Sequence, residues 1–195
     1  TDLNVSGVST FAAITAGSDA TINSITVGKG ANSVAGNTVV GESALDAVTT
    51  GGNNVAVGLE ALTANTTGDG HVSVGRYSLR GNTTGVNNTA IGFNAISKIT
   101  TTGHCTAVGN HSQFENLSAA RCTSLGSQSL YNITTGDDNV ALGYNALTTA
   151  TTAAYNVAVG SYAGDAITTG GSNTTIGHNA GTAITDGASN VAVGK

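Results

Sequence analysis

The residues with reactive or metal-binding side chains are few in this sequence. Two cysteines and four histidines are the candidate nucleophiles, bases and zinc ligands, and they are Cys105, Cys122, His71, His104, His111 and His178. None of them falls in a nucleophile elbow, a metal-binding helix motif or a phosphate loop. The two cysteines stand one repeat apart, so we expect neighbouring free thiols rather than a disulfide. We expect no catalysis, no cofactor and no metal.

Carboxylates in glycine-rich turns are the other candidate ligands. Asp69 and the adjacent pair Asp137 and Asp138 lie in such turns, where oxygen ligands for calcium often occur. Two adjacent carboxylates lack the full oxygen-ligand pattern of a calcium loop. They therefore do not change the expectation of no metal.

The element that positions all of these residues is a repeat. A glycine preceded by a branched aliphatic residue returns every 17 residues, and these glycines are Gly41, Gly58, Gly75, Gly92, Gly109, Gly126, Gly143, Gly160, Gly177 and Gly194. A fixed short period means that each unit is one structural turn that cannot bury its apolar side alone. We expect stacked coils with a spacing of about 4.8 Å rather than one globular core.

Composition narrows the class of protein further. The chain has 28 glycines, no proline, methionine or tryptophan, 9% charged and 4% aromatic residues, which suits short strands joined by tight turns. A net charge of -5 with six scattered cations offers no basic stripe for nucleic acid. No apolar run approaches a membrane span. Because the sequence begins at Thr1 and not at methionine, we expect a segment of a longer protein.

Alternation before each glycine predicts a strand with two different faces. The residue before the glycine is Val, Ile or Leu, and the residue two positions earlier is Thr or Val. Alternate side chains of a strand share a face, so we expect both columns to point into the coil. An Ala/Ser column and a largely leucine column, which begin at Ala44 and Leu45, should complete the core.

The column between the two aliphatic positions is small and uncharged, which predicts burial on this face as well. A second copy of the chain is the expected cover, because cyclic homo-oligomers commonly bury a repeated surface. The alternative is a monomeric solenoid with a bland surface. The predicted oligomer interface consists of Ala56, Ser73, Ala90, Ala107, Ser124, Ala141, Ala158 and Ala192.

Two polar columns accompany the strand. Asparagine stands four residues before most of the glycines, with His71, Cys105 and Cys122 as the exceptions, and stacked amides are expected to bond from coil to coil. A threonine column indicates hydroxyl bonding along the stack and also suggests the threonine arrays of ice-binding solenoids. Its members are Thr49, Thr66, Thr83, Thr100, Thr134, Thr151, Thr168 and Thr185.

Recognition is expected at the variable positions that follow each glycine. Aromatic and histidine side chains there, and Phe114 nearby, could contact sugar rings or a protein surface, although they could equally cover the turns of the rod. The predicted receptor contacts are Tyr77, Phe93, His111, Phe114, Tyr144, Tyr162 and His178. The coil from Gly109 to Gly126 departs most from the repeat, because Gln113 replaces the leucine and Leu117 the threonine.

The segments Asn54-Val-Ala-Val-Gly58, Asn88-Thr-Ala-Ile-Gly92 and Asn139-Val-Ala-Leu-Gly143 resemble repeats of tail-fibre and other structural proteins of bacteriophages, especially those of cyanobacteria. They are also similar to the head repeats of trimeric autotransporter adhesins. The resemblance covers about residues 24–195 and implies a left-handed parallel β-roll, three chains side by side, and attachment. We expect a virion rather than a bacterial surface, since no autotransporter stalk or anchor is recognised.

These observations together predict an all-β parallel β-solenoid in residues 24–195, preceded by a connecting segment in residues 1–23. The expected function is that of a homotrimeric rod in a phage fibre or appendage, which acts as a spacer and contacts a host-surface polysaccharide. Other virion proteins are its expected partners. A bacterial adhesin head and an ice-binding solenoid are the alternatives.

Overall fold

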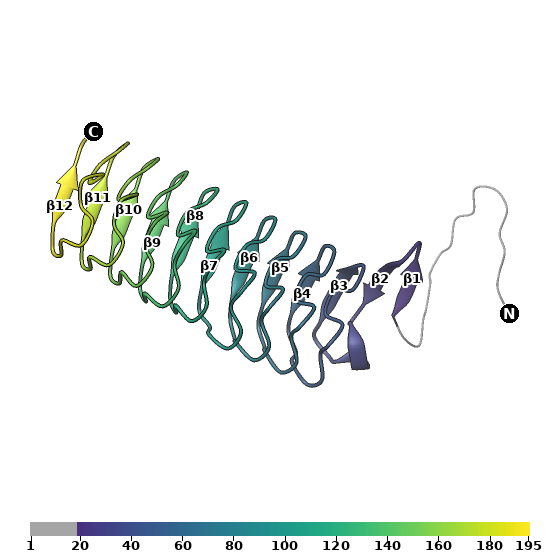
Figure 1. Ribbon diagram of the computed structural model, residues 1–195. Helices are drawn as coiled ribbons and strands as arrows, with labels where there is room; N and C mark the ends of the chain where they lie inside the picture. Colours follow the sequence, from purple (N-terminus) through teal and green to yellow (C-terminus); the bar gives the residue numbers. More distant parts are fainter. Residues whose placement is uncertain (1–18) are drawn as a thin grey trace, which may run out of the picture.

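The computed structural model describes residues 19–195 and shows a rod of stacked coils (Figure 1). Each coil contributes one short strand, and each strand from β3 to β11 pairs in parallel with the strand of the next coil. The register follows the sequence period, so that Ala56 of β4 lies beside Ser73 of β5. The predicted parallel β-solenoid with a 17-residue repeat is confirmed.

The ten parallel strands lie along one side of the rod (Figure 1). They are β3 (Thr38–Gly41), β4 (Val55–Val57), β5 (Val72–Val74), β6 (Thr89–Ile91), β7 (Thr106–Val108), β8 (Thr123–Leu125), β9 (Val140–Leu142), β10 (Val157–Val159), β11 (Thr174–Ile176) and β12 (Val191–Val193).

An antiparallel hairpin precedes the parallel stack. Its strands are β1 (Ala20–Ile22) and β2 (Ile25–Gly28), and β2 pairs antiparallel with β3. A short 3-10 turn, η1 (Ala31–Ser33), then leads into the first coil. The predicted boundary at residue 24 falls in the turn of this hairpin, and residues 1–18 of the predicted connecting segment lie outside the described residues.

Backbone hydrogen bonds join the coils on all sides and not only along the sheet. The turn after the strand is bonded to the next coil through Leu45 N, which donates to Ala61 O at 3.0 Å. The far side is bonded through Thr49 N, which donates to Thr66 O at 2.9 Å. The whole circumference is therefore a continuous ladder, which explains how a coil with a three-residue strand holds its shape.

The repeat glycine is required by both conformation and space. The backbone at these ten glycines has φ between 122° and 157°, a region that residues with a side chain rarely adopt. A Cβ atom on Gly58 would lie 2.7 Å from the carbonyl carbon of Gly75 in the next coil. The invariant 17-residue spacing follows, because each glycine stacks on the next one.

The interior of the rod is filled from the turn after the strand. The predicted Ala/Ser and leucine columns are buried, and Leu45, Leu62 and Leu147 have no exposed surface. A further buried column lies seven residues after each glycine and was not recognised in the sequence. It contains Val48, Asn65, Asn82, Ile99, Asn116, Ile133, Ala150 and Ile167.

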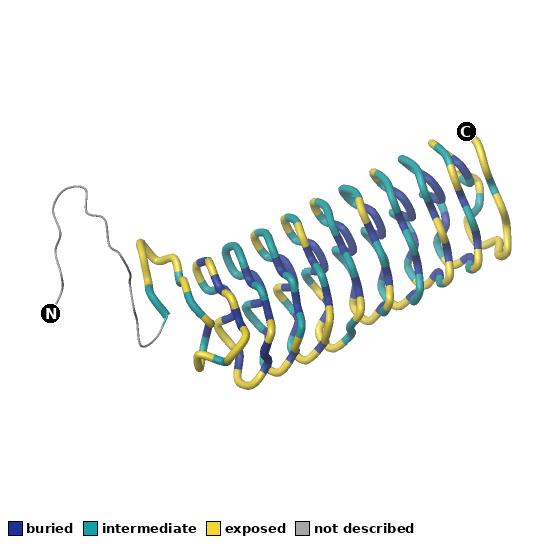
Figure 2. The backbone as a smooth tube through the Cα atoms, turned by 180° about the vertical axis from the view of Figure 1, so that it is seen from behind, coloured by how far each residue is buried: buried dark blue, intermediate teal, exposed yellow. Residues whose placement is uncertain are grey.

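The strand faces the opposite way from the prediction. The small middle column points into the coil, and the Thr/Val and aliphatic columns point outward, where Ile91 is 38% and Leu125 52% exposed. The large side chains that enter from the facing turn already fill the narrow interior, so only a small side chain fits on the inner face of the strand. Figure 2 shows buried residues in the successive coils of the rod, except at its C-terminal end, where the chain is exposed or intermediate.

This orientation corrects the predicted oligomer interface. Seven of its members are fully buried within the single chain, so they cannot meet another subunit, and these are Ala56, Ser73, Ala90, Ala107, Ser124, Ala141 and Ala158. The eighth, Ala192, lies in the last coil and is half-buried.

Candidate functional site

The outward side of the sheet is one continuous surface of β-branched and aliphatic residues, which we call the aliphatic face. No charged residue belongs to either of its two columns. The column before the glycines is Val40, Val57, Val74, Ile91, Val108, Leu125, Leu142, Val159, Ile176 and Val193, and the second column is Thr38, Val55, Val72, Thr89, Thr106, Thr123, Val140, Val157, Thr174 and Val191. An exposed apolar surface that runs the length of a protein is typical of an interaction site.

The turn after each glycine carries a second surface, the aromatic row, which consists of Tyr77, Phe93, His111, Phe114 and Tyr131. Successive ring centroids are 6.1 Å apart for Tyr77 and Phe93, 5.1 Å for Phe93 and His111, and 5.0 Å for His111 and Phe114. Phe114 stacks on Tyr131 at 5.4 Å. The structure thus brings four of the predicted receptor contacts together and adds Tyr131, which the sequence analysis missed because it does not directly follow a glycine.

The other three predicted contacts form a separate group in later coils. Tyr144 and Tyr162 lie edge to face at 5.3 Å, and Tyr162 and His178 at 6.3 Å. Burial, together with the neighbouring Tyr144, raises the pKa of the Tyr162 hydroxyl.

Three cations lie over the aromatic row. Arg76 and Arg80 are 4.4 Å and 4.9 Å from the centroid of the Tyr77 ring, and Lys98 is 4.8 Å from that of Phe114. Two of them have acidic partners, because Arg80 pairs with Glu60 at 2.8 Å and Lys98 with Glu115 at 2.6 Å. Sequence analysis treated the cations as scattered, and only the stacking of coils brings these three to one edge.

The asparagine column forms the predicted ladder of side-chain amides. Asn54 Nδ2 donates to Gly68 O at 3.0 Å, and Asn54 Oδ1 accepts from the backbone N–H of His71 at 2.9 Å. His71 continues the ladder, because its Nδ1 accepts from Asn88 N at 3.1 Å and its Nε2 lies 2.7 Å from Gly85 O. Burial lowers the pKa of His71, so its ring is a neutral structural member of the column.

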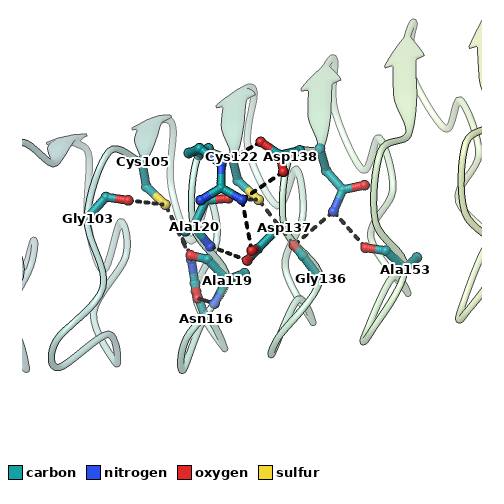
Figure 3. Close-up of polar contacts among 12 residues, drawn as sticks. Gly103, Cys105, Asn116, Ala119, Ala120, Cys122, Gly136, Asp137, Asp138 and Ala153 are labelled. Atoms are coloured by element: carbon teal, nitrogen blue, oxygen red, sulfur yellow. Dashed lines mark hydrogen bonds and ion pairs between the residues drawn. The ribbon is translucent and has the colours of Figure 1, made fainter.

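The thiol groups of the two cysteines take the place of the asparagine Nδ2 group as hydrogen-bond donors in this column. Cys105 Sγ donates to Ala119 O at 3.2 Å and Cys122 Sγ to Gly136 O at 3.3 Å, and both thiols are free and buried (Figure 3). Burial raises the pKa of both thiols, and that of Cys122 reaches about 12. A protonated, buried thiol is neither a nucleophile nor a metal ligand.

Two of the carboxylates considered for calcium, Asp137 and Asp138, are engaged with a cation, and the third, Asp69, accepts from Asn53 Nδ2 at 3.2 Å. Arg121 Nε donates to Asp138 Oδ1 at 2.7 Å, and Arg121 Nη2 to Asp137 Oδ2 at 3.0 Å (Figure 3). Arg121 lowers the pKa of Asp138 by direct hydrogen bonding. Asp137 also accepts from Ala120 N at 2.8 Å, so these three residues join neighbouring coils.

The coil from Gly109 to Gly126 has a polar interior that is satisfied within itself. Gln113 is fully buried, and its Nε2 donates to Thr106 O and to Ser124 Oγ, each at 3.0 Å. Asn116 Nδ2 donates to Gln113 Oε1 at 3.1 Å. The replacement of leucine by Gln113 therefore changes the chemistry of the core, whereas Leu117 in the threonine position is exposed.

The threonine column directs its hydroxyl groups along the rod. Thr49 Oγ1 donates to Thr66 O and Thr66 Oγ1 to Thr83 O, each at 3.0 Å. Hydroxyl groups that bond the backbone of the next coil are stabilising elements of the stack. This arrangement does not favour the ice-binding alternative.

Within residues 19–195, no group of three or more His, Cys, Asp and Glu side chains is placed to hold a metal ion. The same part of the chain contains no helix with the length and apolarity needed to cross a bilayer. Comparison with family models, with curated proteins and with solved structures finds no match to this chain.

Proposed function

We propose that the chain is a structural rod that self-associates through its aliphatic face. The observation that carries this proposal is a surface of two uncharged columns, one aliphatic and one of Thr and Val, whose residues are exposed or partly exposed over ten successive strands. A parallel sheet is normally covered on both faces, and here only the inner face is covered by the chain itself. Identical faces on three chains would cover one another around a common axis.

The sequence resemblance extends this proposal to a role. We propose a homotrimer of left-handed coils in a phage fibre or virion appendage, where a stiff rod separates a host-binding part from the particle and contributes to attachment. Antibodies against the rod should label the fibres or appendages of virions that carry the chain, and label inside the capsid would contradict this role.

Charge inserted into the aliphatic face tests self-association directly. We expect three chains per particle for the wild type by light scattering coupled to gel filtration. The double variant Ile91→Lys/Leu125→Lys should give single chains with an unchanged β-sheet circular dichroism spectrum. These two side chains are half-exposed in one chain, so the substitutions do not disturb its core.

The matched control is Thr84→Lys/Thr135→Lys, which adds the same two charges at exposed positions away from the sheet. This control should keep the wild-type mass. A wild-type protein with the mass of one chain would overturn the proposal. A trimeric Ile91→Lys/Leu125→Lys variant would show that another surface forms the interface.

A further inference from the structure

The aromatic row has the chemistry of a binding site that is independent of self-association. We propose that it binds an acidic glycan, which lies along the rod with a sugar carboxylate on Arg76 and a sugar ring against Phe93. This inference rests on the proposed attachment role and names the class of ligand. It concerns the edge of the rod, whereas self-association uses the sheet.

Arg76 carries the charge of this site. The protein has a net charge of -5 and six cations, of which three lie on the aromatic row. Arg80 and Lys98 are neutralised by Glu60 and Glu115, but Arg76 has no carboxylate partner among residues 19–195. Arg76 Nη2 donates to the Tyr77 hydroxyl oxygen at 2.8 Å, which orients the guanidinium group beside the rings.

The rings supply the apolar part of the site. Phe93 is 37% exposed, and its neighbours Tyr77 and His111 lie on either side of it along the row. The ring spacing of 5.0 to 6.1 Å continues over five residues along the edge of the rod. An extended surface of this kind fits a chain-like ligand better than a small molecule, which needs a concave site.

The backbone that carries these side chains is hydrogen-bonded to neighbouring coils before any ligand binds. Tyr77 N donates to Leu59 O at 3.0 Å, and His111 N donates to Phe93 O at 2.9 Å, so the turns that carry the row are part of the ladder. A turn whose backbone is already ordered loses little conformational entropy on binding. Pre-organisation therefore favours recognition by this edge.

Charge distinguishes an acidic glycan from nucleic acid. Aromatic rows also bind single-stranded nucleic acid, but they do so with a positively charged groove that follows the phosphates. Of the three cations on the aromatic row, one lacks an acidic partner among residues 19–195, and the whole protein is acidic. A single guanidinium group beside aromatic rings matches a sugar chain that carries a carboxylate.

Calorimetry with the full chain tests the inference with three probes, which are hexagalacturonate, a neutral galactan hexasaccharide and the oligonucleotide dT12. We expect hexagalacturonate to bind about tenfold more tightly than the neutral hexasaccharide, which is the size of one charge-assisted hydrogen bond. Arg76→Gln should remove this preference, and Phe93→Ala should weaken both sugars.

Two control variants remove a comparable side chain elsewhere. Tyr155→Ala deletes an aromatic residue that is 64% exposed and outside the row, and Lys29→Gln deletes an exposed cation. Neither should change the affinity for hexagalacturonate. Equal affinity for both sugars, no binding of hexagalacturonate, tighter binding of dT12, or unaltered binding by Arg76→Gln would each overturn the inference.

The molar mass of every variant separates this inference from the proposed function. A trimer that binds neither sugar would contradict the acidic-glycan site and leave self-association intact. A single chain that binds hexagalacturonate would contradict self-association and leave the site intact.

Discussion

Two coils of the same length fill their narrow interiors with residues of different polarity. The coil from Gly143 to Gly160 is regular, with Leu147 and Ala150 buried inside it and Asn156 in the amide ladder. The coil from Gly109 to Gly126 instead buries Gln113 and Asn116 and carries Cys122 in the ladder position. Their strands nevertheless pair in the same parallel register.

This difference shows that backbone geometry, and not one particular core, defines the repeat. A buried polar side chain is tolerated when its hydrogen-bonding groups find partners. Gln113 bonds to Thr106 O, Ser124 and Asn116, so the irregular coil replaces apolar contacts by a connected polar network.

Substitution of the repeat glycine should lower stability most, and the loss should be equal in the two coils. Gly109→Ala and Gly143→Ala each place a side chain at φ near 140° and against the backbone of the next coil. We expect a loss of at least about 4 kcal/mol in the free energy of unfolding for both. Urea denaturation measures it, and a much smaller loss in the irregular coil would contradict a common backbone frame.

Gly194→Ala is the matched control for this measurement. Gly194 has a similar backbone conformation at φ 122°, but no atom lies within 4 Å of the position of an added Cβ. It should cost only the strain of a side chain at this φ, about 1 to 3 kcal/mol, and less than either stacked glycine.

An exchange of the core residues between the two coils should have the next largest effect on stability. The loss should be larger in the regular coil than in the irregular one. Leu147→Gln buries an amide beside Ala150, where no Asn116 equivalent bonds it, and should lose about 3 kcal/mol. Gln113→Leu should change stability by about 1 kcal/mol or less, because Asn116 keeps its bond to Ala119 O. Adding Ala150→Asn to Leu147→Gln should recover part of the lost free energy of unfolding. Equal losses for Leu147→Gln and Gln113→Leu would contradict the view that Gln113 and its neighbours satisfy one another's hydrogen bonds.

Substitution of the residue four positions before the glycine, Asn156 in one coil and Cys122 in the other, should give a smaller difference in stability. Asn156 Oδ1 accepts from Asn173 N at 2.9 Å, and Asn156 Nδ2 donates to Gly170 O at 3.0 Å. Asn156→Ala leaves both buried groups without a partner and should cost about 2 kcal/mol. Cys122→Ala removes one weak thiol bond and should cost less than about 1 kcal/mol. Chemical denaturation of the two variants checks this order.

A third kind of ladder residue, His71, should add a pH dependence that neither asparagine nor cysteine gives. Its pKa is lowered in the folded state, so the unfolded chain binds the proton more readily. The contribution of His71 should be complete above pH about 6.5 and decline as the pH falls below this value toward the folded-state pKa. His71→Asn should make thermal stability less dependent on pH between 7 and 5, and an unchanged pH profile would contradict this assignment.

The smallest effect on stability is expected for the ion pairs that Arg121 forms on the outer surface of the irregular coil. Arg121 contacts Asp137 and Asp138 across neighbouring coils, but it is exposed to solvent. Arg121→Gln should lower the melting temperature slightly at low salt, and the difference should vanish at about 1 M salt, where charges are screened within about 3 Å. A loss that persists at high salt would indicate that Arg121 has a packing role.

Much of this fold was predictable because its signals are local and periodic. The glycine period predicted the length of a coil, and the asparagine column predicted the side-chain hydrogen bonds between coils. Both are visible in the sequence because each requires one residue type at one spacing. The variable positions after the glycines located most of the aromatic row. The buried column at Val48 and Ile99 was not predicted, because its mixture of Val, Ile, Asn and Ala shows no single residue type.

The sequence by itself determined that the strand has two faces, since alternation separates Ala56 from Val55 and Val57. It did not determine which face lies inside, because both are uncharged and the rule that large apolar residues are buried gave the wrong orientation. Only the tertiary structure decided this: Leu62 and its equivalents enter from the facing turn and fill the interior, so that the strand must turn its small side chains inward and its branched ones outward. The tertiary structure likewise brought Arg76, Arg80 and Lys98 to one edge, because neighbours in a solenoid are residues one coil apart.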